Sequence, residues 1–140
     1  GLILTTGPHM RRYFFSVDQA VSLVDQALRL KDKLNGKILS VEMKSSKMID
    51  ILKTWIKKYG GKYKIINTRK GDRLDEYLIG EDELKYTQEL KIKNKKYYII
   101  DFNKLSKKPL KKVVSSANAK RLSTSEIEKI IQFGINNNDL

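Results

Sequence analysis

The chain has 140 residues, 40% of them hydrophobic, with no cysteine and a single histidine, His9. One compact core fits this length, and the composition excludes disulfide bonds, thiolate metal sites and histidine clusters. A membrane-spanning helix needs a run of about 18 apolar residues, which the sequence does not contain. The start also lacks the charged-then-apolar pattern of a signal peptide. We therefore expect a soluble, cytoplasmic protein.

The first predicted helix follows Ser16. Ser16 and Gln19 form a capping-box pattern, and apolar residues recur at helical spacing as far as Leu28. The helix is expected to end near residues 35–36, because the glycine there is a common helix terminator.

A strand and a second helix are predicted next. Residues 37–43 alternate enough to form a strand, and either Ser45 or Ser46 is expected to cap the helix that follows. The pair of glycines at residues 60–61 should end this helix.

Four short strands are predicted in the middle of the chain. Two of them, over residues 63–67 and 74–79, flank a turn that contains a glycine, and the other two, over residues 86–92 and 97–102, form a hairpin. Residues 106–121 are rich in lysine, serine and asparagine and contain a proline, which is typical of an extended arm or linker. A capping-box serine at residue 123 then begins the last helix.

The turn between the first two of these strands carries the most informative segment. Residues 69–76 read Arg-Lys-Gly-Asp-Arg-Leu-Asp-Glu. They resemble the Arg-Pro-Gly-Glu-Lys-Leu-His-Glu segment of the capsular-polysaccharide nucleotide-sugar dehydratases and epimerases, extended short-chain dehydrogenase/reductase enzymes that act on UDP-N-acetylhexosamines. Four further segments resemble the same family in the same order. They are residues 6–15 (Thr-Gly-Pro-His-Met-Arg-Arg-Tyr-Phe-Phe), 36–51, 79–83 and 115–122 (Ser-Ser-Ala-Asn-Ala-Lys-Arg-Leu).

The resemblance implies a fold and a place in a larger enzyme. The fold would be a small mixed α/β domain of about three helices and short strands. It would form the substrate-binding C-terminal part of an extended short-chain dehydrogenase/reductase enzyme, without the Rossmann domain. Residues 1–105 would be the substrate-binding domain, and residues 106–140 a C-terminal arm and helix of the polysaccharide-biosynthesis type. The complete enzyme would act in capsule or surface polysaccharide biosynthesis.

The cofactor and catalytic motifs of such an enzyme do not occur in the sequence. NAD or NADP, implied for the complete enzyme, needs a Gly-x-Gly-x-x-Gly turn, and the chemistry needs a Tyr-x-x-x-Lys pair. We therefore assign no catalytic, cofactor-binding or metal residue to this chain. The expected partners are a UDP-sugar and either the missing Rossmann half or further copies of the chain. Whether the chain is part of an enzyme or an inactive gene product stays open.

Arg69 and Asp72 are the first candidate substrate-binding residues. A guanidinium group can form two hydrogen bonds to a pyrophosphate, and a carboxylate can accept hydrogen bonds from ribose hydroxyls. Each has a structural alternative, which is an exposed turn arginine for Arg69 and a turn-capping aspartate for Asp72.

Arg11, Arg12 and Met10 are the other candidates. They precede the first helix, whose N-terminus favours anions, so a phosphate there would meet two guanidinium groups. Arg12 and Met10 match the family pattern. The alternative is a pair of exposed arginines beside a cap. Residues 7–10 also resemble the remnant of a cleaved purification tag, although most of them fit the family pattern.

The charge of the chain gives a competing interpretation. Its 29 basic and 16 acidic side chains leave a formal net charge of +13, and lysines crowd residues 91–112 near Tyr97, Tyr98 and Phe102. Lysine with aromatic residues is a mixture that nucleic-acid binders use. However, lysine far outnumbers arginine here and no nucleic-acid-binding signature is present. A basic module that binds nucleic acid or another polyanion is therefore the alternative function, and nucleic acid is the less favoured partner.

Overall fold

The computed structural model describes residues 1–67 and 69–136. Within them the chain forms a small mixed α/β fold of short strands and helices, as predicted. The strands are β1 (Leu2–Thr5), β2 (Arg11–Phe14), β3 (Ile38–Val41), β4 (Lys44–Lys47), β5 (Lys62–Ile65), β6 (Tyr77–Ile79), β7 (Thr87–Ile92), β8 (Lys95–Ile100) and β9 (Val114–Ser115). The helices are α1 (Val17–Arg29), α2 (Lys31–Leu34), α3 (Met48–Tyr59), α4 (Thr124–Asn136) and the 3₁₀ helix η1 (Glu81–Tyr86).

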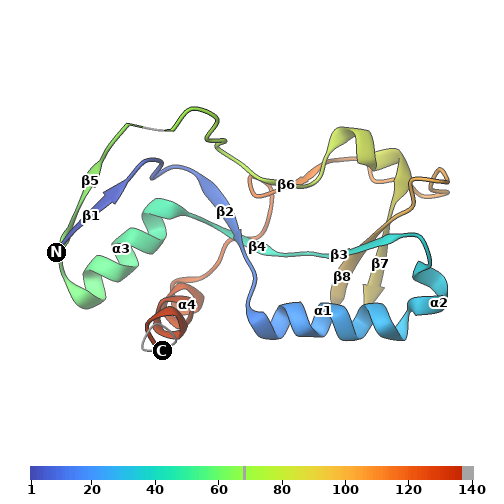
Figure 1. Cartoon of the computed structure of the whole chain (residues 1–140), viewed down its shortest axis with the longest axis horizontal. Coiled ribbons are helices and arrows are strands. Elements are labelled where there is room, and N and C mark those ends of the chain that lie inside the picture. Colours follow the sequence, from blue (N-terminus) through green and yellow to red (C-terminus); the bar gives the residue numbers. More distant parts are fainter. Residues whose placement is uncertain (68, 137–140) are drawn as a thin grey trace.

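The elements are arranged along an elongated molecule (Figure 1). One end contains the parallel pair β1–β5 together with α3 and α4, and the other contains α1, α2 and the antiparallel sheet β3-β8-β7. The antiparallel pair β2–β4 crosses between the two ends. A fourth pair, β6–β9, joins the middle of the chain to its C-terminal part.

The hairpin predicted near residues 86–102 is confirmed as β7–β8. Its turn is shorter than expected, because Lys95 already pairs with Ile92 and only Lys93 and Asn94 remain in the turn. Both have positive φ angles, 46° and 65°. A two-residue turn of this kind matches the right-handed twist of the strands that it joins.

The first predicted helix is confirmed at its start and shorter than predicted at its end. Gln19 N–H donates to Ser16 Oγ, and Ser16 N–H donates to Gln19 Oε1, so the capping box forms. α1 stops at Arg29, after which the chain turns at Leu30 into the separate helix α2. Gly36, with a φ angle of 70°, follows α2. Leu34 at the end of α2 is buried.

The prediction that Ser45 or Ser46 caps the second helix is wrong. Both serines belong to β4, where they are buried and pair with β2. The Ser45 hydroxyl donates to Ser116 O at 2.8 Å, a bond to a distant part of the chain. α3 begins at Met48 after Lys47, with no side-chain cap.

The buried core lies around β6 and β8, at the end of the molecule that contains the β3-β8-β7 sheet. Ile79, Tyr98 and Ile100 form a buried cluster. β6 is shorter than the strand predicted over residues 74–79, while the strand predicted over 63–67 is present as β5. The segment predicted as an arm or linker over residues 106–121 is partly built into the fold, because it contains β9, which pairs with β6, and the buried Ser115 and Ser116. Residues 137–140, at the end of the second predicted domain, lie outside the described residues, and the division into two domains stays a prediction.

Candidate functional site

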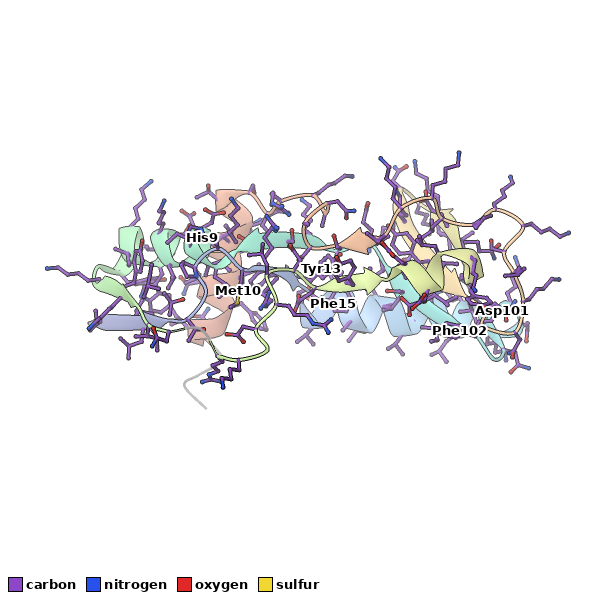
Figure 2. All side chains as sticks on the ribbon, turned by 90° about the horizontal axis from the view of Figure 1, so that it is seen from above. His9, Met10, Tyr13, Phe15, Asp101 and Phe102 are labelled. Atoms are coloured by element: carbon purple, nitrogen blue, oxygen red, sulfur yellow. The ribbon has the colours of Figure 1, made fainter. Side chains whose placement is uncertain are left out.

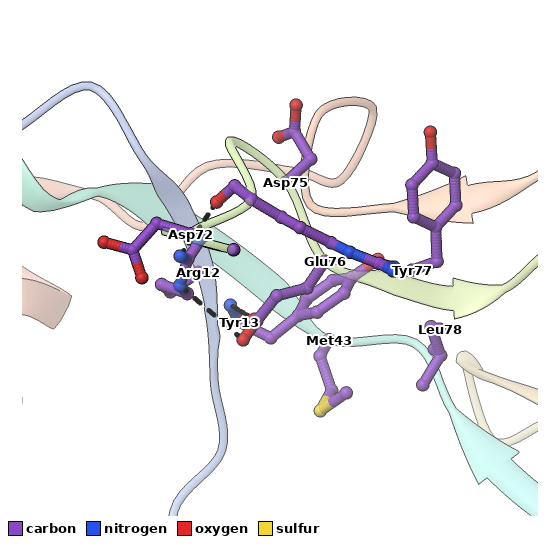
Figure 3. Close-up of a pocket in the computed structure, with 10 residues that line it drawn as sticks. Arg12, Tyr13, Met43, Asp72, Asp75, Glu76, Tyr77 and Leu78 are labelled. Carbon is purple, nitrogen blue, oxygen red and sulfur yellow. Dashed lines mark hydrogen bonds and ion pairs between the residues drawn. The ribbon is translucent and has the colours of Figure 1, made fainter. Parts of the chain in front are cut away.

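An open cleft of about 600 Å³ lies where β2 meets the segment that leads into β6 (Figure 3). The structure thus brings together two parts of the chain that carry the predicted binding residues, although about sixty residues separate them in sequence. The residues that line the cleft are Arg12, Tyr13, Met43, Gly71, Asp72, Arg73, Asp75, Glu76, Tyr77 and Leu78.

Arg11 is bound to a carboxylate. Its Nε lies 2.5 Å from Asp75 Oδ1 and its Nη2 lies 2.6 Å from Asp75 Oδ2, which is a two-pronged ion pair. This contact lowers the pKa of Asp75 below its usual value and raises that of Arg11. Asp75 therefore occupies the Nε and Nη2 side of the guanidinium, which could otherwise form paired hydrogen bonds to an anion.

Arg12 spans the same segment from the other side of β2. Its guanidinium donates to the carbonyl oxygens of Arg73 at 2.9 Å and Leu74 at 3.3 Å, and Nε lies 3.7 Å from Glu76 Oε1. The Met10 sulfur lies 3.0 Å from its Nη2. Arg12 lines the cleft, but most of its hydrogen-bonding capacity holds the cleft wall in place.

Arg69 and Asp72 form a turn with each other. Arg69 N–H donates to Asp72 Oδ2 at 3.1 Å, and Asp72 N–H donates to Arg69 O at 3.1 Å. Gly71 lies between them with a φ angle of 91°, which favours glycine. Asp72 therefore caps the turn, which was the structural alternative to a substrate-binding role for this residue. It also lines the cleft. Arg69 is exposed and is not among the lining residues.

Arg73 is a candidate that sequence reasoning missed. Its side chain is exposed and lines the cleft, and it has no ion-pair partner among residues 1–67 and 69–136. Its backbone carbonyl is held by Arg12, so the base of the side chain is fixed. A signal was present in the sequence, because the family segment that residues 69–76 resemble also has a basic residue at this place.

Ser116 supports the cleft wall from behind. Its Oγ accepts a hydrogen bond from Glu76 N–H at 2.9 Å and lies 3.0 Å from Asp75 Oδ1, and its N–H donates to Glu76 O at 2.8 Å. Arg121 donates to Ser116 O at 2.6 Å and also contacts Ser45 Oγ. The segment 115–122, for which the sequence analysis predicted no role in the site, therefore braces the wall.

Tyr13 places a buried hydroxyl beside the cleft. This hydroxyl has no hydrogen-bond partner among the described residues. Burial, and after it the nearby Tyr98, Glu76 and Asp75, raises the pKa of Tyr13 well above its usual value. The phenol therefore stays neutral at physiological pH.

Tyr13→Phe is expected to leave the stability unchanged or to raise the free energy of unfolding by up to about 1 kcal/mol. The substitution removes a polar atom whose desolvation no hydrogen bond offsets and keeps the ring. Urea denaturation of both proteins measures the difference. A loss above about 1 kcal/mol would mean that the hydroxyl is hydrogen-bonded in the folded protein.

Two other kinds of feature are absent from the described part of the chain. No group of three or more histidine, cysteine, aspartate and glutamate side chains is placed to hold a metal ion. None of the described helices is long and apolar enough to cross a membrane.

The described residues form a small mixed α/β domain with an open cleft beside β2. A model of the polysaccharide biosynthesis protein family matches residues 1–101. The chain belongs to this family.

A relative and a solved structure show how far the likeness extends. The relative is a protein of Methanocaldococcus jannaschii, described as an uncharacterized membrane protein. It is 32% identical over an aligned length of 142 residues, and the alignment covers 94% of this chain and 41% of that protein. The X-ray structure of Pen from Bacillus thuringiensis has the same fold with a TM-score of 0.75 at 23% identity, over 95% of this chain and 40% of that one. The chain thus spans about two fifths of the length of both proteins.

Proposed function

We propose that the chain is the substrate-binding part of a nucleotide-sugar dehydratase or epimerase, and that its cleft takes a UDP-N-acetylhexosamine. Membership of the family supports a role in polysaccharide biosynthesis. The observation that carries the finer proposal is the meeting of the 69–76 segment with Arg12 around one open cleft. Both contribute to the resemblance to the UDP-sugar enzymes.

The proposal divides the candidate residues into two groups. Arg73 from the cleft lining and Arg69 from the exposed turn beside it supply the cationic groups for the diphosphate, because neither guanidinium is paired with an acid within the described residues. Asp72 accepts hydrogen bonds from the ribose hydroxyls at the edge of the turn. Arg11, Arg12 and Met10 hold the turn against β2, so that the cations are already oriented when substrate arrives. The sequence analysis expected these three residues to bind the substrate directly, and we propose a positioning role for them instead.

We propose that NAD or NADP, implied for the complete enzyme, binds outside this chain. NAD or NADP binds where a glycine-rich turn connects a parallel strand to a helix. Here α3 follows the antiparallel strand β4 through Lys47, without a glycine. We therefore assign no chemical step to the cofactor in this chain.

Two exposed apolar surfaces support a partner that covers them. The parallel pair β1–β5 has two strands, and Leu2 and Leu4 are 61% and 58% exposed on it, whereas parallel sheets are normally buried on both faces. The second surface is a stripe of exposed apolar side chains along one face of α1, which consists of Val17, Val21, Val24 and Leu28. We propose that the Rossmann half covers both surfaces, and a second copy of the chain is the alternative.

Titration calorimetry of the chain with UDP and with UDP-N-acetylglucosamine tests the proposed function. Saturable binding is expected, and Arg69→Ala is expected to weaken it about tenfold, the value of one charge-assisted hydrogen bond. Lys70→Ala is the matched control, since it removes the same charge from the same turn and should leave the affinity within about twofold.

The titrations also separate the alternatives. Equal losses in Arg69→Ala and Lys70→Ala would mean a general attraction of charges and would contradict a specific contact between Arg69 and the diphosphate. Binding of an oligonucleotide with no response to UDP would favour the polyanion function instead. If neither UDP nor UDP-N-acetylglucosamine binds, this result would contradict the proposal that the cleft binds its substrate without the Rossmann half.

A further inference from the structure

The loop formed by residues 102–113, here called the basic loop, is a strongly basic surface outside the cleft. It contains five lysines and no acidic residue. None of these lysines forms an ion pair within the described part of the chain. Asp101, the acid next to the loop, is instead 3.7 Å from Lys37. The five lysines are Lys104, Lys107, Lys108, Lys111 and Lys112.

The basic loop is anchored to the body at both ends. Ser106 N–H donates to Lys85 O at 2.9 Å, and Lys104 N–H donates to Asp101 O at 3.1 Å. The Phe102 ring packs against Tyr86 with its centroid at 5.6 Å. At the other end Leu110 packs against the buried cluster around Ile79. The lysines are therefore presented from a fixed base.

Two large apolar side chains stand exposed among these lysines. Leu105 is 63% exposed and Phe102 is 52% exposed. Apolar side chains beside lysines match the boundary of a bilayer, where the apolar groups enter the headgroup region and the ammonium groups meet anionic headgroups. A nucleic acid fits less well, because Phe102 already packs against Tyr86 and the loop has no arginine to form paired hydrogen bonds with phosphate.

The basic loop lies at the opposite end of the molecule from the parallel pair β1–β5. β1 and β5 lie at one end of the molecule, and the loop lies at the other, beside the β3-β8-β7 sheet (Figure 1). Figure 2 likewise shows Asp101 and Phe102 at the far end from His9 and Met10. A partner on the parallel pair β1–β5 would therefore not cover the loop.

We propose that the basic loop binds the surface of an anionic phospholipid bilayer. The lysines provide the attraction, and Leu105 enters the headgroup region. This inference is independent of the function proposed for the cleft.

Sedimentation of the chain with phosphatidylcholine vesicles, made with and without phosphatidylserine, tests this proposal. Binding only to the anionic vesicles is expected, and added salt should weaken it. The triple variant Lys107→Gln, Lys108→Gln, Lys111→Gln is expected to bind roughly 100-fold more weakly, from about fivefold for each lysine. Leu105→Ser should weaken binding to vesicles but leave the binding of an oligonucleotide unchanged.

A second triple variant, Lys53→Gln, Lys57→Gln, Lys64→Gln, is the matched control. It removes the same charge from exposed positions at the β1–β5 end of the molecule, and it should retain most of the binding. The proposal is overturned if the chain does not bind anionic vesicles, or if the two triple variants lose binding equally. It is also overturned if Leu105→Ser has no effect on vesicles while the oligonucleotide binds as tightly as they do.

Discussion

Arg73→Ala is expected to lower the affinity of the chain for UDP by roughly 10- to 100-fold. A hydrogen bond from a guanidinium to a phosphate is worth about 1.5–3 kcal/mol, and each 1.4 kcal/mol is tenfold in affinity. Arg73 is the arginine of the cleft lining whose guanidinium no described carboxylate or carbonyl occupies. Its loss would therefore leave no other side chain of the lining free to replace it. Titration calorimetry with UDP measures the change.

Two further substitutions show what the Arg73 side chain contributes. Arg73→Lys keeps the charge but not the forked geometry, so an affinity between those of the wild type and Arg73→Ala is expected. The melting temperature of Arg73→Ala should stay near that of the wild type, because the side chain is exposed. If Arg73→Ala binds UDP as tightly as the wild type, the cleft is not where the diphosphate binds, whatever Arg69→Ala does.

The elements that sequence could predict are those specified by nearby residues. The start of α1 depends on Ser16 and Gln19, three positions apart, and the β7–β8 hairpin depends on a short polar turn between two apolar runs. Both elements form as these local signals predict, because the local preferences agree with the rest of the fold. Ser45 and Ser46 had an equally good local signal for a helix cap, yet Ser45 bonds to Ser116 and both serines are buried in β4. No local pattern reports a partner 71 positions away.

The candidate site divides in the same way. The 69–76 segment could be predicted from its own residues, and so could the arginines that precede α1. That Arg11 binds Asp75 could not be predicted, since 64 positions separate the two residues. An arginine beside a helix N-terminus is as well placed to bind a phosphate as to bind a carboxylate of the same chain. That Arg73 lines the cleft whereas Arg69 does not likewise depends on the course of the turn, which Asp72 and Arg12 determine.

Ile79→Ala is expected to lower the free energy of unfolding by about 3 kcal/mol, within the range for large-to-small substitutions in a core. Ile79 has no exposed surface and packs against Tyr98 and Ile100. It ends β6, the strand that leads away from the cleft wall, so this contact joins the wall to the core. Urea denaturation measures the loss.

Leu105→Ala is the control for this substitution. It also truncates a large aliphatic side chain, but one that is 63% exposed, so a change of about 0.5 kcal/mol or less is expected. Similar losses in the two variants would mean that β6 is not anchored in the core. A large loss in Ile79→Ala alone would instead link the cleft wall to the stability of the β3-β8-β7 sheet, because Tyr98 and Ile100, the buried side chains of this cluster beside Ile79, come from β8. The geometry that orients Arg73 would then depend on a core that lies outside the cleft.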